Sequence, residues 1–289
     1  TSTTFSKDTR LYATYTPKNI TVTWSLRGAA DSSAAKHGSW TSSLSDNADK
    51  TKTRPYDGNA LGGLVPSAPM RAGYQFVGWS TEPSPDGKST YEGVNFITPD
   101  NALPTSDTTY YARWREIIHV GWHTNDGDWD EGGYYYRSTD SLWGDPVSPI
   151  SNKVNRTGYA FLGWSTDQSA TQPDQQYVQK VTGPLTYYAV WKANDYALTL
   201  DANGGSWAQG VADPPTIQAT YDSVLPTEGV PVPTWTGRKF LGYNDRADGT
   251  GKAYYGANEG GTAVADPKRW DKVTPGALYA QWQVIEYPI

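Results

Sequence analysis

Apolar and polar residues alternate along several short stretches of the chain with a period of two, which is typical of β-strands. In YYAVW (187–191), Tyr187, Ala189 and Trp191 share one face of the expected strand. Related stretches occur as LYATY (11–15), YYARW (110–114) and LYAQW (278–282). The residue after Ala varies among the copies, whereas Ala keeps its place beside an aromatic ring. We therefore predict that the constant face lies in a core and that the other face is wetter.

A second stretch, GYAFLGW (158–164), is apolar on both faces and is repeated as GYQFVGW (73–79) and GRKFLGY (237–243). A strand that is apolar on both sides is expected to be covered on both sides. Glycine inside a strand weakens it unless a neighbour must approach closely. We expect these glycines to make room for a ring, such as that of the Trp in the later YAxW stretch. The residues predicted to form the structural core are Phe76, Gly78, Trp79, Trp114, Phe161, Gly163, Trp164, Trp191, Phe240, Gly242, Tyr243 and Trp282.

A third kind of stretch precedes each GYxFxGW stretch and the YAxW stretch that follows it. LTLDANGGSW (198–207) aligns without gaps on VGWHTNDGDW (120–129), and its Asn-Gly and Asp-Gly steps predict hairpin turns. The earliest copy is VTWSLRG (22–28), followed by an insertion and then GSW (38–40). The three stretches recur in one order about every 80 residues, a period that exceeds the roughly 20–50 residues of solenoid repeats and suits small domains.

This order predicts the domain layout. We expect a tail at 1–16 that ends a preceding repeat, a repeat with an insertion at 17–115, and further repeats at 116–193 and 194–289. The chain would then be a fragment of a longer protein.

The junctions between repeats are short. Residues 192–197, Lys-Ala-Asn-Asp-Tyr-Ala, contain neither Gly nor Pro, which favours a semi-rigid arrangement of repeats end to end. The 20 prolines argue against long helices, although one short helix per repeat is compatible with the pattern.

The DANGG-type opening, the Pro-rich middle, GYxFxGW and LYAxW together resemble the Listeria–Bacteroides repeat, the family of the internalin B-type repeats. The resemblance covers nearly the whole chain. It implies a mainly β or α+β chain of tandem β-grasp-like repeats from a bacterial surface protein, where such repeats serve as stalk, spacer or adhesion module. The chain departs from the pattern in the insertion of the first repeat, in Tyr243 where Trp is expected, and in the long second half of the last repeat.

Composition narrows the possible functions. The net charge of −6 argues against nucleic acid and anionic membranes as partners. The absence of cysteine excludes disulfides, zinc-thiolate sites and thiol nucleophiles, and it fits an exported bacterial protein as well as some cytosolic ones. There is no signal peptide and no apolar run of membrane-spanning length. The 13 Trp and 21 Tyr supply the expected core.

One segment is a candidate metal site. His119 and His123 fall on one face of an extended stretch, which is followed by Asp126, Asp128, Asp130 and Glu131. A calcium loop requires Gly where Glu131 stands and a bidentate Glu where Arg137 stands. We therefore interpret the segment as a polar hairpin tip aligned with DANGG, and we expect no metal and no cofactor.

Catalytic patterns are weak. The third histidine is His37, and there is no G-x-S-x-G elbow. Sequence leaves a pair of glycosidase carboxylates open, but the acidic residues do not recur whereas the aromatic residues do. We expect no enzyme.

The stretch GWHTNDGDWDEGGYYY (121–136) resembles a single choline-binding repeat. Its aromatic residues either pack within a hairpin or form a ligand-binding patch made of Trp122, Trp129, Tyr134 and Tyr136.

The predicted function is that of a non-catalytic stalk or spacer in a secreted, cell-surface or cell-wall protein of bacteria, with a role in adhesion to host or other cells. The alternative is a carbohydrate- or choline-binding module that uses exposed Trp and Tyr. The expected partner is a host or bacterial surface protein or a glycan, with no nucleic acid and no membrane insertion, and the chain is expected to be a monomer. A stalk should expose few aromatic residues, whereas a glycan binder needs a contiguous aromatic patch.

Overall fold

The computed structural model describes residues 10, 12–27, 38–83, 87–88 and 91–286. Most of the predicted tail, the insertion of the first repeat and His37 lie outside the described residues. The described chain divides into two compact units, which are considered separately. Unit 1 contains the described residues up to Val120, together with Ser138–Pro149 and Gln176–Leu185. Unit 2 contains Gly121–Arg137, Ile150–Gln175 and the described residues from Thr186 onward.

Unit 1 is built on a sheet whose strands come from both ends of the first repeat. Strand β1 (Asn19–Ser25) pairs antiparallel with β2 (Lys50–Pro55) and parallel with β4 (Thr108–His123), whose last three residues belong to unit 2. On its other side β4 pairs antiparallel with β3 (Tyr74–Ser80). Strand β6 (Tyr136–Leu142) also pairs with β4. Among the described residues the only helix is the 3₁₀ turn Gly62–Leu64 (η1).

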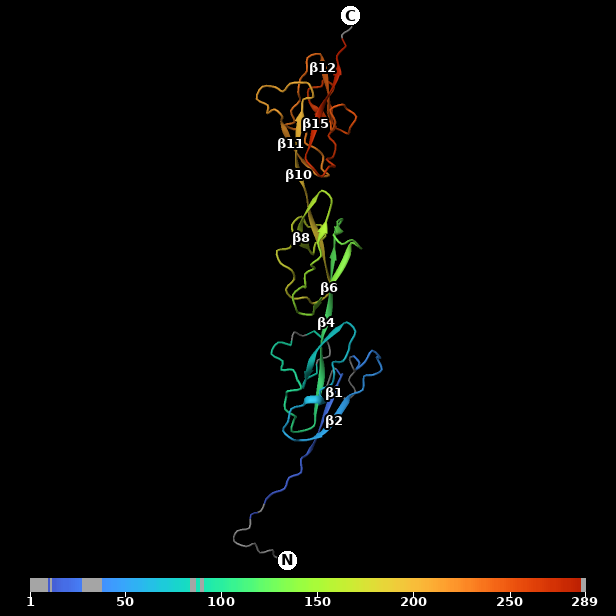
Figure 1. Cartoon of the computed structure of the whole chain (residues 1–289), viewed down its shortest axis with the longest axis vertical. Coiled ribbons are helices and arrows are strands. Elements are labelled where there is room, and N and C mark those ends of the chain that lie inside the picture. The colour runs from blue at the N-terminus through green and yellow to red at the C-terminus, as the bar shows by residue number, and fades with distance from the viewer. Residues whose placement is uncertain (1–9, 11, 28–37, 84–86, 89–90, 287–289) are drawn as a thin grey trace, which may run out of the picture. The chain divides into compact units, whose positions relative to one another are not determined.

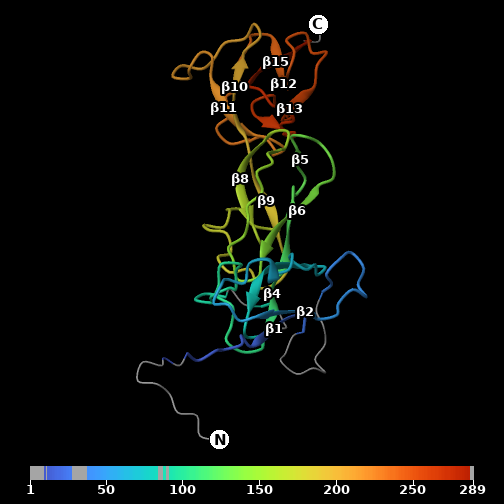
Figure 2. The same ribbon diagram turned by 60° about the horizontal axis from the view of Figure 1, so that its bottom comes forward.

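Unit 2 contains the complete sheet of the third repeat, in which β10, β11, β12 and β15 are grouped together (Figure 1). The strands are β10 (Asp195–Asp201), β11 (Thr216–Thr220), β12 (Arg238–Asn244), β13 (Ala253–Ala257), β14 (Val264–Ala265) and β15 (Gly276–Val284). Their order is β11-β10-β15-β12-β13-β14, and β10 and β15 are parallel. Figure 2 shows β13 beside β12 in this sheet.

Unit 2 also contains strands of the second repeat. Strand β9 (Leu185–Ala193) lies between β4 and β8 (Tyr159–Ser165) in the sheet, and β8 is antiparallel to β9. The short strands β5 (Asp128–Trp129) and β7 (Val154–Asn155) pair antiparallel in a separate two-stranded sheet.

The strand order in the third repeat is that of a β-grasp sheet: an opening hairpin, a closing strand parallel to the first strand, and a further strand at the opposite side. No α-helix occurs between β11 and β12 in the structure as described, and this crossover contains Pro226, Pro231 and Pro233. Proline lacks the N–H that a helix interior requires, so this connection stays irregular. The prediction of a mainly β chain with tandem β-grasp-like repeats is confirmed. The predicted repeat boundaries stay predictions.

Aromatic residues form much of the core. In unit 1, Trp24, Trp79, Trp114 and Tyr110 pack with Ile20, Val22 and other aliphatic residues. In unit 2, the third repeat packs Phe240, Tyr243, Tyr254, Tyr255 and Trp270 against Leu198, Leu200 and Leu278. Indole and phenol rings bury a large apolar area each, which compensates for the scarcity of Phe and Met.

Candidate functional site

The recurring aromatic residues line the cores, with one exception. The buried ones are Trp79, Trp114, Trp164, Phe240 and Tyr243, and the half-buried ones are Phe76, Trp191 and Trp282. Phe161 was expected to be buried but is 40% exposed, whereas its counterpart Phe240 is 2% exposed.

Phe161 and Phe240 differ in what lies beside their strands. Both rings have the same neighbours at the same spacing: Phe161 lies 5.5 Å from Trp191, and Phe240 lies 5.8 Å from Trp282. In the third repeat, the loop between β13 and β14 brings Gly261 against the backbone of Phe240. A Cβ on Gly261 would lie 2.9 Å from the Phe240 carbonyl oxygen. No strand of the described second repeat takes the place of β13 beside β8.

The glycines of the GW stretches lie at β-bulges. Gly78, Gly163 and Gly242 have φ values of +149°, +145° and +130°, which residues with a Cβ rarely adopt. The pairing register shifts at the same step in all three strands, between Phe76 and Gly78, Phe161 and Gly163, and Phe240 and Gly242. A bulge of this kind bends and twists the strand locally.

The neighbours of these glycines differ from those expected. A Cβ would lie 2.5 Å from the ring of Phe96 at Gly78 and 2.7 Å from Pro173 at Gly163. At Gly242 the close neighbour is the backbone carbonyl of Tyr255 in β13. The expectation that the Trp of the YAxW stretch fills this space is wrong, because the bulge turns each glycine toward the segment that follows its own strand.

The Trp of each YAxW stretch instead packs against a glycine of the opening turn. The contacting pairs are Trp114 with Gly38, Trp191 with Gly127, and Trp282 with Gly205, and a Cβ at these glycines would lie 2.4–2.9 Å from the indole Cζ2. The glycines therefore keep the turn and the closing strand in contact.

Two asparagines that the sequence indicated only as turn residues connect the same elements. Asn203 has a φ of 49°, and its Nδ2 donates to the carbonyl oxygens of Ala280 in β15 (2.9 Å) and Ala247 (2.8 Å). The indole N–H of Trp282 donates to the carbonyl of Ala202 at 3.1 Å.

The second repeat has the same connection. Asn125 has a φ of 50°, and its Nδ2 donates to the carbonyl oxygens of Ala189 (3.0 Å) and Gln168 (3.2 Å). Trp191 donates to the carbonyl of Thr124 at 2.9 Å. The gapless alignment of LTLDANGGSW on VGWHTNDGDW was the signal that could have identified this pair, because it places Asn125 on Asn203.

The proposed ligand patch does not form as one surface. Trp122 and Trp129 are buried, and Trp122 stacks on Tyr187 at 4.9 Å because it lies on the core face of β4. Tyr134 and Tyr136 are exposed. The patch is therefore reduced to exposed tyrosines, which include the neighbouring Tyr135.

Three of the four acidic residues of the 126–131 segment, Asp126, Asp130 and Glu131, are paired with cations or amides. Glu131 accepts hydrogen bonds from Arg137 (3.0 Å) and Asn152 (2.9 Å), and Asp130 accepts one from Asn155 (2.8 Å). The side chain of His119 pairs with Asp140 at 2.6 Å. Within the described residues, no group of three or more His, Asp and Glu residues is placed to hold a metal ion.

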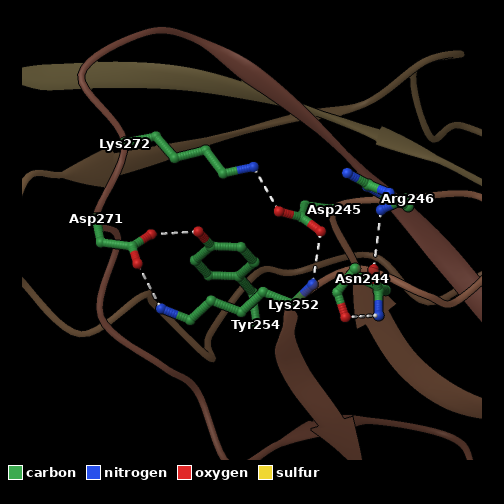
Figure 3. Close-up of polar contacts among 8 residues, drawn as sticks. Asn244, Asp245, Arg246, Lys252, Tyr254, Asp271 and Lys272 are labelled. Carbon is green, nitrogen blue, oxygen red and sulfur yellow. Dashed lines mark hydrogen bonds and ion pairs between the residues drawn. The ribbon is translucent and has the colours of Figure 1, made fainter.

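The densest polar network of the third repeat joins the β12–β13 hairpin to the segment before β15. Figure 3 shows Lys272 pointing toward Asp245 and Lys252 pointing toward Asp271, with ion pairs of 2.5 and 2.7 Å. The hydroxyl of Tyr254 donates to the second oxygen of Asp271. Positive and negative groups alternate, so each carboxylate is neutralised by a lysine.

The pKa shifts follow from this arrangement. Burial raises the pKa of Asp245, but hydrogen bonds from Lys272 and from the backbone of Lys252 outweigh it, and the net pKa lies below the ordinary value. Hydrogen bonds from Lys252 and Tyr254 lower the pKa of Asp271. Burial, with the hydrogen bond to Asp271, raises the pKa of Tyr254. Both carboxylates are thus held ionised, which suits structural ion pairs better than acid–base chemistry.

None of the described helices has the length and apolar character needed to cross a membrane.

The fold and its recurring contacts define a tandem β-grasp-like repeat protein. The sequence profile of the Listeria-Bacteroides repeat domain matches residues 35–113, 119–190 and 196–268. These matches cover most of the chain, and the chain therefore belongs to this family.

Three relatives are similar to this chain. A protein of Evansella cellulosilytica, inferred to be a Gly-rich membrane protein, is 28% identical over 76% of this chain and 23% of its own length. A second inferred membrane protein of that organism is 26% identical over 78% of this chain and 29% of its length. Internalin H of Listeria monocytogenes is 29% identical over 45% of this chain and 21% of its length. The chain thus spans less than a third of each relative.

Proposed function

We propose that this chain is a non-catalytic spacer in a bacterial surface or secreted protein, and that it holds other parts of that protein away from the cell. The observation that carries the proposal is that the recurring residues serve the fold. The Asn125 and Asn203 hydrogen bonds, the bulge glycines and the buried aromatic residues all act inside the repeats. These recurring residues support the proposal that each repeat is a structural module.

The membership in the repeat family and the names of the relatives support a surface location. A role in adhesion belongs to the same proposal. The repeats would increase the distance between the cell and the adhesive part of the protein. Their end-to-end arrangement is an expectation that rests on the short junctions between them.

A display experiment tests the spacer function. The chain is placed between a cell-surface anchor and an epitope on capsulated bacteria, and antibody binding to the epitope is measured by flow cytometry. We expect binding to fall when residues 194–289 are deleted, because the epitope is then nearer to the cell. A full-length variant with Tyr134→Ala and Tyr136→Ala serves as the control and should bind antibody as well as the parent. Binding that is independent of the number of repeats would contradict the proposal.

The exposed tyrosines Tyr134, Tyr135 and Tyr136 favour a second candidate, a carbohydrate- or choline-binding module. Tyrosine faces attract quaternary ammonium groups. Titration with choline, followed by NMR shifts of these three rings, tests this candidate, and unchanged shifts at millimolar choline would exclude it.

A further inference from the structure

The third repeat contains a groove of about 810 Å³ that lies apart from the exposed tyrosines of the second repeat. Three segments of unit 2 form it: the opening turn at Gly204 and Ser206, residues 233–240 around the start of β12, and residues 259–262. Trp282 of β15 also lines it. Its size lies within the roughly 300–1,000 Å³ that is usual for small-molecule sites.

One wall of the groove is specific to this repeat. Residues 259–262 belong to the loop between β13 and β14. These two strands lie in the second half of the third repeat, which is longer than the family pattern predicts. Among the strands described, β8 pairs only with β9, and beside β3 the position of β13 is taken only by a single antiparallel bridge between Trp79 and Ile97. The additional segment therefore adds a surface, and it does not merely lengthen a loop.

This wall is held in one conformation. The Asn258 side-chain oxygen accepts hydrogen bonds from the backbone N–H of Thr262 (2.8 Å) and Ala263 (3.2 Å). Gly261 packs against the backbone of Phe240. A ligand would meet a formed groove and would not have to order the loop, which lowers the entropic cost of binding.

Aromatic and cationic groups meet in the groove. Trp235 and Trp282 pack edge to face at 5.7 Å, and Trp235 reaches this position because Gly204 lacks a Cβ. The guanidinium of Arg238 lies 4.1 Å from the Trp235 ring centre and is exposed. A guanidinium that lies over a ring can keep N–H groups available for a planar anion.

The charges and hydroxyls of the lining indicate the ligand class. Arg238 and Lys239 outweigh Glu259, although the chain as a whole carries a net charge of −6. Hydroxyl side chains complete the lining, namely those of Ser206, Thr234, Thr236 and Thr262. Hydroxyls and half-buried tryptophans suit sugar rings, and the cations suit a carboxylate or sulfate.

We propose that this groove binds an anionic oligosaccharide, with sugar rings against Trp235 and Trp282 and an acidic substituent on Arg238. The proposal is independent of the spacer function, because a repeat can extend a protein whether or not it binds a ligand.

Calorimetric titration of the whole chain tests the proposal with three hexasaccharides. A heparin hexasaccharide carries sulfate and carboxylate, a polygalacturonate hexamer carries carboxylate alone, and maltohexaose is neutral. We expect at least one anionic probe to bind and maltohexaose not to bind. Binding of the heparin probe alone would identify sulfate as the recognised group.

The variants locate the site. Arg238→Ala should weaken binding about tenfold or more, because a charge-assisted contact is lost. Glu259→Lys should strengthen binding, because it removes the one opposing charge. Arg156→Ala is the matched control: Arg156 stacks on Tyr159 at 3.9 Å in the corresponding turn of the second repeat, where no β13–β14 loop exists. The Arg156→Ala substitution removes one positive charge, as Arg238→Ala does, and should leave the affinity within twofold of that of the parent.

Three results would overturn the proposal. One is the absence of binding by both anionic probes at millimolar concentration. Another is an equal loss of affinity in Arg238→Ala and Arg156→Ala, which would indicate unspecific attraction to surface charge. The last is stronger binding of a hexaglutamate peptide with the same dependence on Arg238, which would assign the groove to acidic peptides.

Discussion

The second and third repeats contain nearly the same strand, yet the phenylalanine of that strand is exposed to solvent in one repeat and buried in the other. In GYAFLGW, Phe161 is 40% exposed, and in GRKFLGY, Phe240 is 2% exposed. The ring contacts within the sheet are alike, and both strands contain the same glycine bulge. Among the described residues, strands corresponding to β13 and β14 lie beside this strand in the third repeat only.

The comparison shows that the recurring stretch determines the strand and its bulge, whereas the segment that follows determines how much of the strand is covered. It also explains where a surface with new chemistry arises. The variable segment that lies against the backbone of Phe240 is the one that supplies the wall of the groove.

The largest expected effect is at these two phenylalanines. Phe240→Ala should destabilise the third repeat by about 3–5 kcal/mol, as for an aromatic residue truncated in a core, and Phe161→Ala should cost well under half of that. Chemical denaturation followed by hydrogen exchange in β12 and β8 measures both. Equal losses would show that the difference in exposure between the two rings has no energetic weight.

Substitutions of Asn125 and Asn203 test the side-chain hydrogen bonds that the two repeats share. Asn203→Ala should cost about 1–3 kcal/mol, because two backbone carbonyls lose their donor, and Asn125→Ala should cost a similar amount. Thermal unfolding monitored by tryptophan fluorescence is a suitable measurement. Asn203→Gly is the control, since it relieves the positive φ without restoring the donor, and a fully stable Gly variant would assign the effect to backbone strain.

Acid should affect the third repeat through its ion-pair network. Because the folded pKa values of Asp245 and Asp271 lie below 3.8, their contribution is present above that pH and is lost as pH falls through the folded values. We expect about 1 kcal/mol or less, since the pairs are partly exposed. Hydrogen exchange in β13 between pH 5 and 2 measures it, and Asp245→Asn should reduce the dependence. An unchanged pH profile in that variant would contradict this role.

The same network should also lose stability when the pH is raised into the alkaline range. The raised pKa of Tyr254 stabilises the fold fully below its unfolded value of about 10, and this contribution is lost as pH rises through the folded value.

A smaller effect is expected at the turn before each of these strands. Arg71 stacks on Tyr74 at 3.5 Å and Arg156 on Tyr159 at 3.9 Å, whereas the third repeat reverses the order with Trp235 before Arg238. Arg156→Ala should cost about 0.5–1 kcal/mol. The exchange of Arg156→Trp with Tyr159→Arg should recover most of that loss in a thermal melt. No recovery would mean that the order of the pair matters.

Metal removal should have no effect. Asp126, Asp130 and Glu131 have protein partners, and no group of three possible ligands occurs among the described residues, so EDTA should leave the melting temperature unchanged. A site occupied well above its dissociation constant would add several kcal/mol by mass action, so a calcium-dependent rise in melting temperature would contradict the interpretation as a hairpin tip.

The sequence predicted the parts of the fold that depend on local pattern. Alternation in YYAVW and LYAQW identified β9 and β15, and the prolines of the crossover excluded a long helix. The strand order came from the family resemblance.

The remaining features depend on which segments meet in three dimensions. Nothing near Phe161 in sequence shows that its strand lacks a cover. The partners of Gly78 and Gly163 lie in the variable loops, and Asn203 finds its acceptor in β15, 77 residues away. The groove could not be predicted for the same reason, because its walls come from separate segments and one of them, residues 259–262, is not part of a recurring stretch.

The parallel pairing of β10 and β15 has a mechanical consequence. These strands begin and end the third repeat and lie side by side, with Leu198 opposite Gly276 and Asp201 opposite Tyr279. A force that pulls on the N-terminal end of β10 and the C-terminal end of β15 makes the two strands slide along each other. The hydrogen bonds between them then resist in shear and must fail together, whereas a hairpin pulled from its open end unzips one bond at a time. Each repeat of this topology is thus suited to carry tension along the chain without unfolding from its ends.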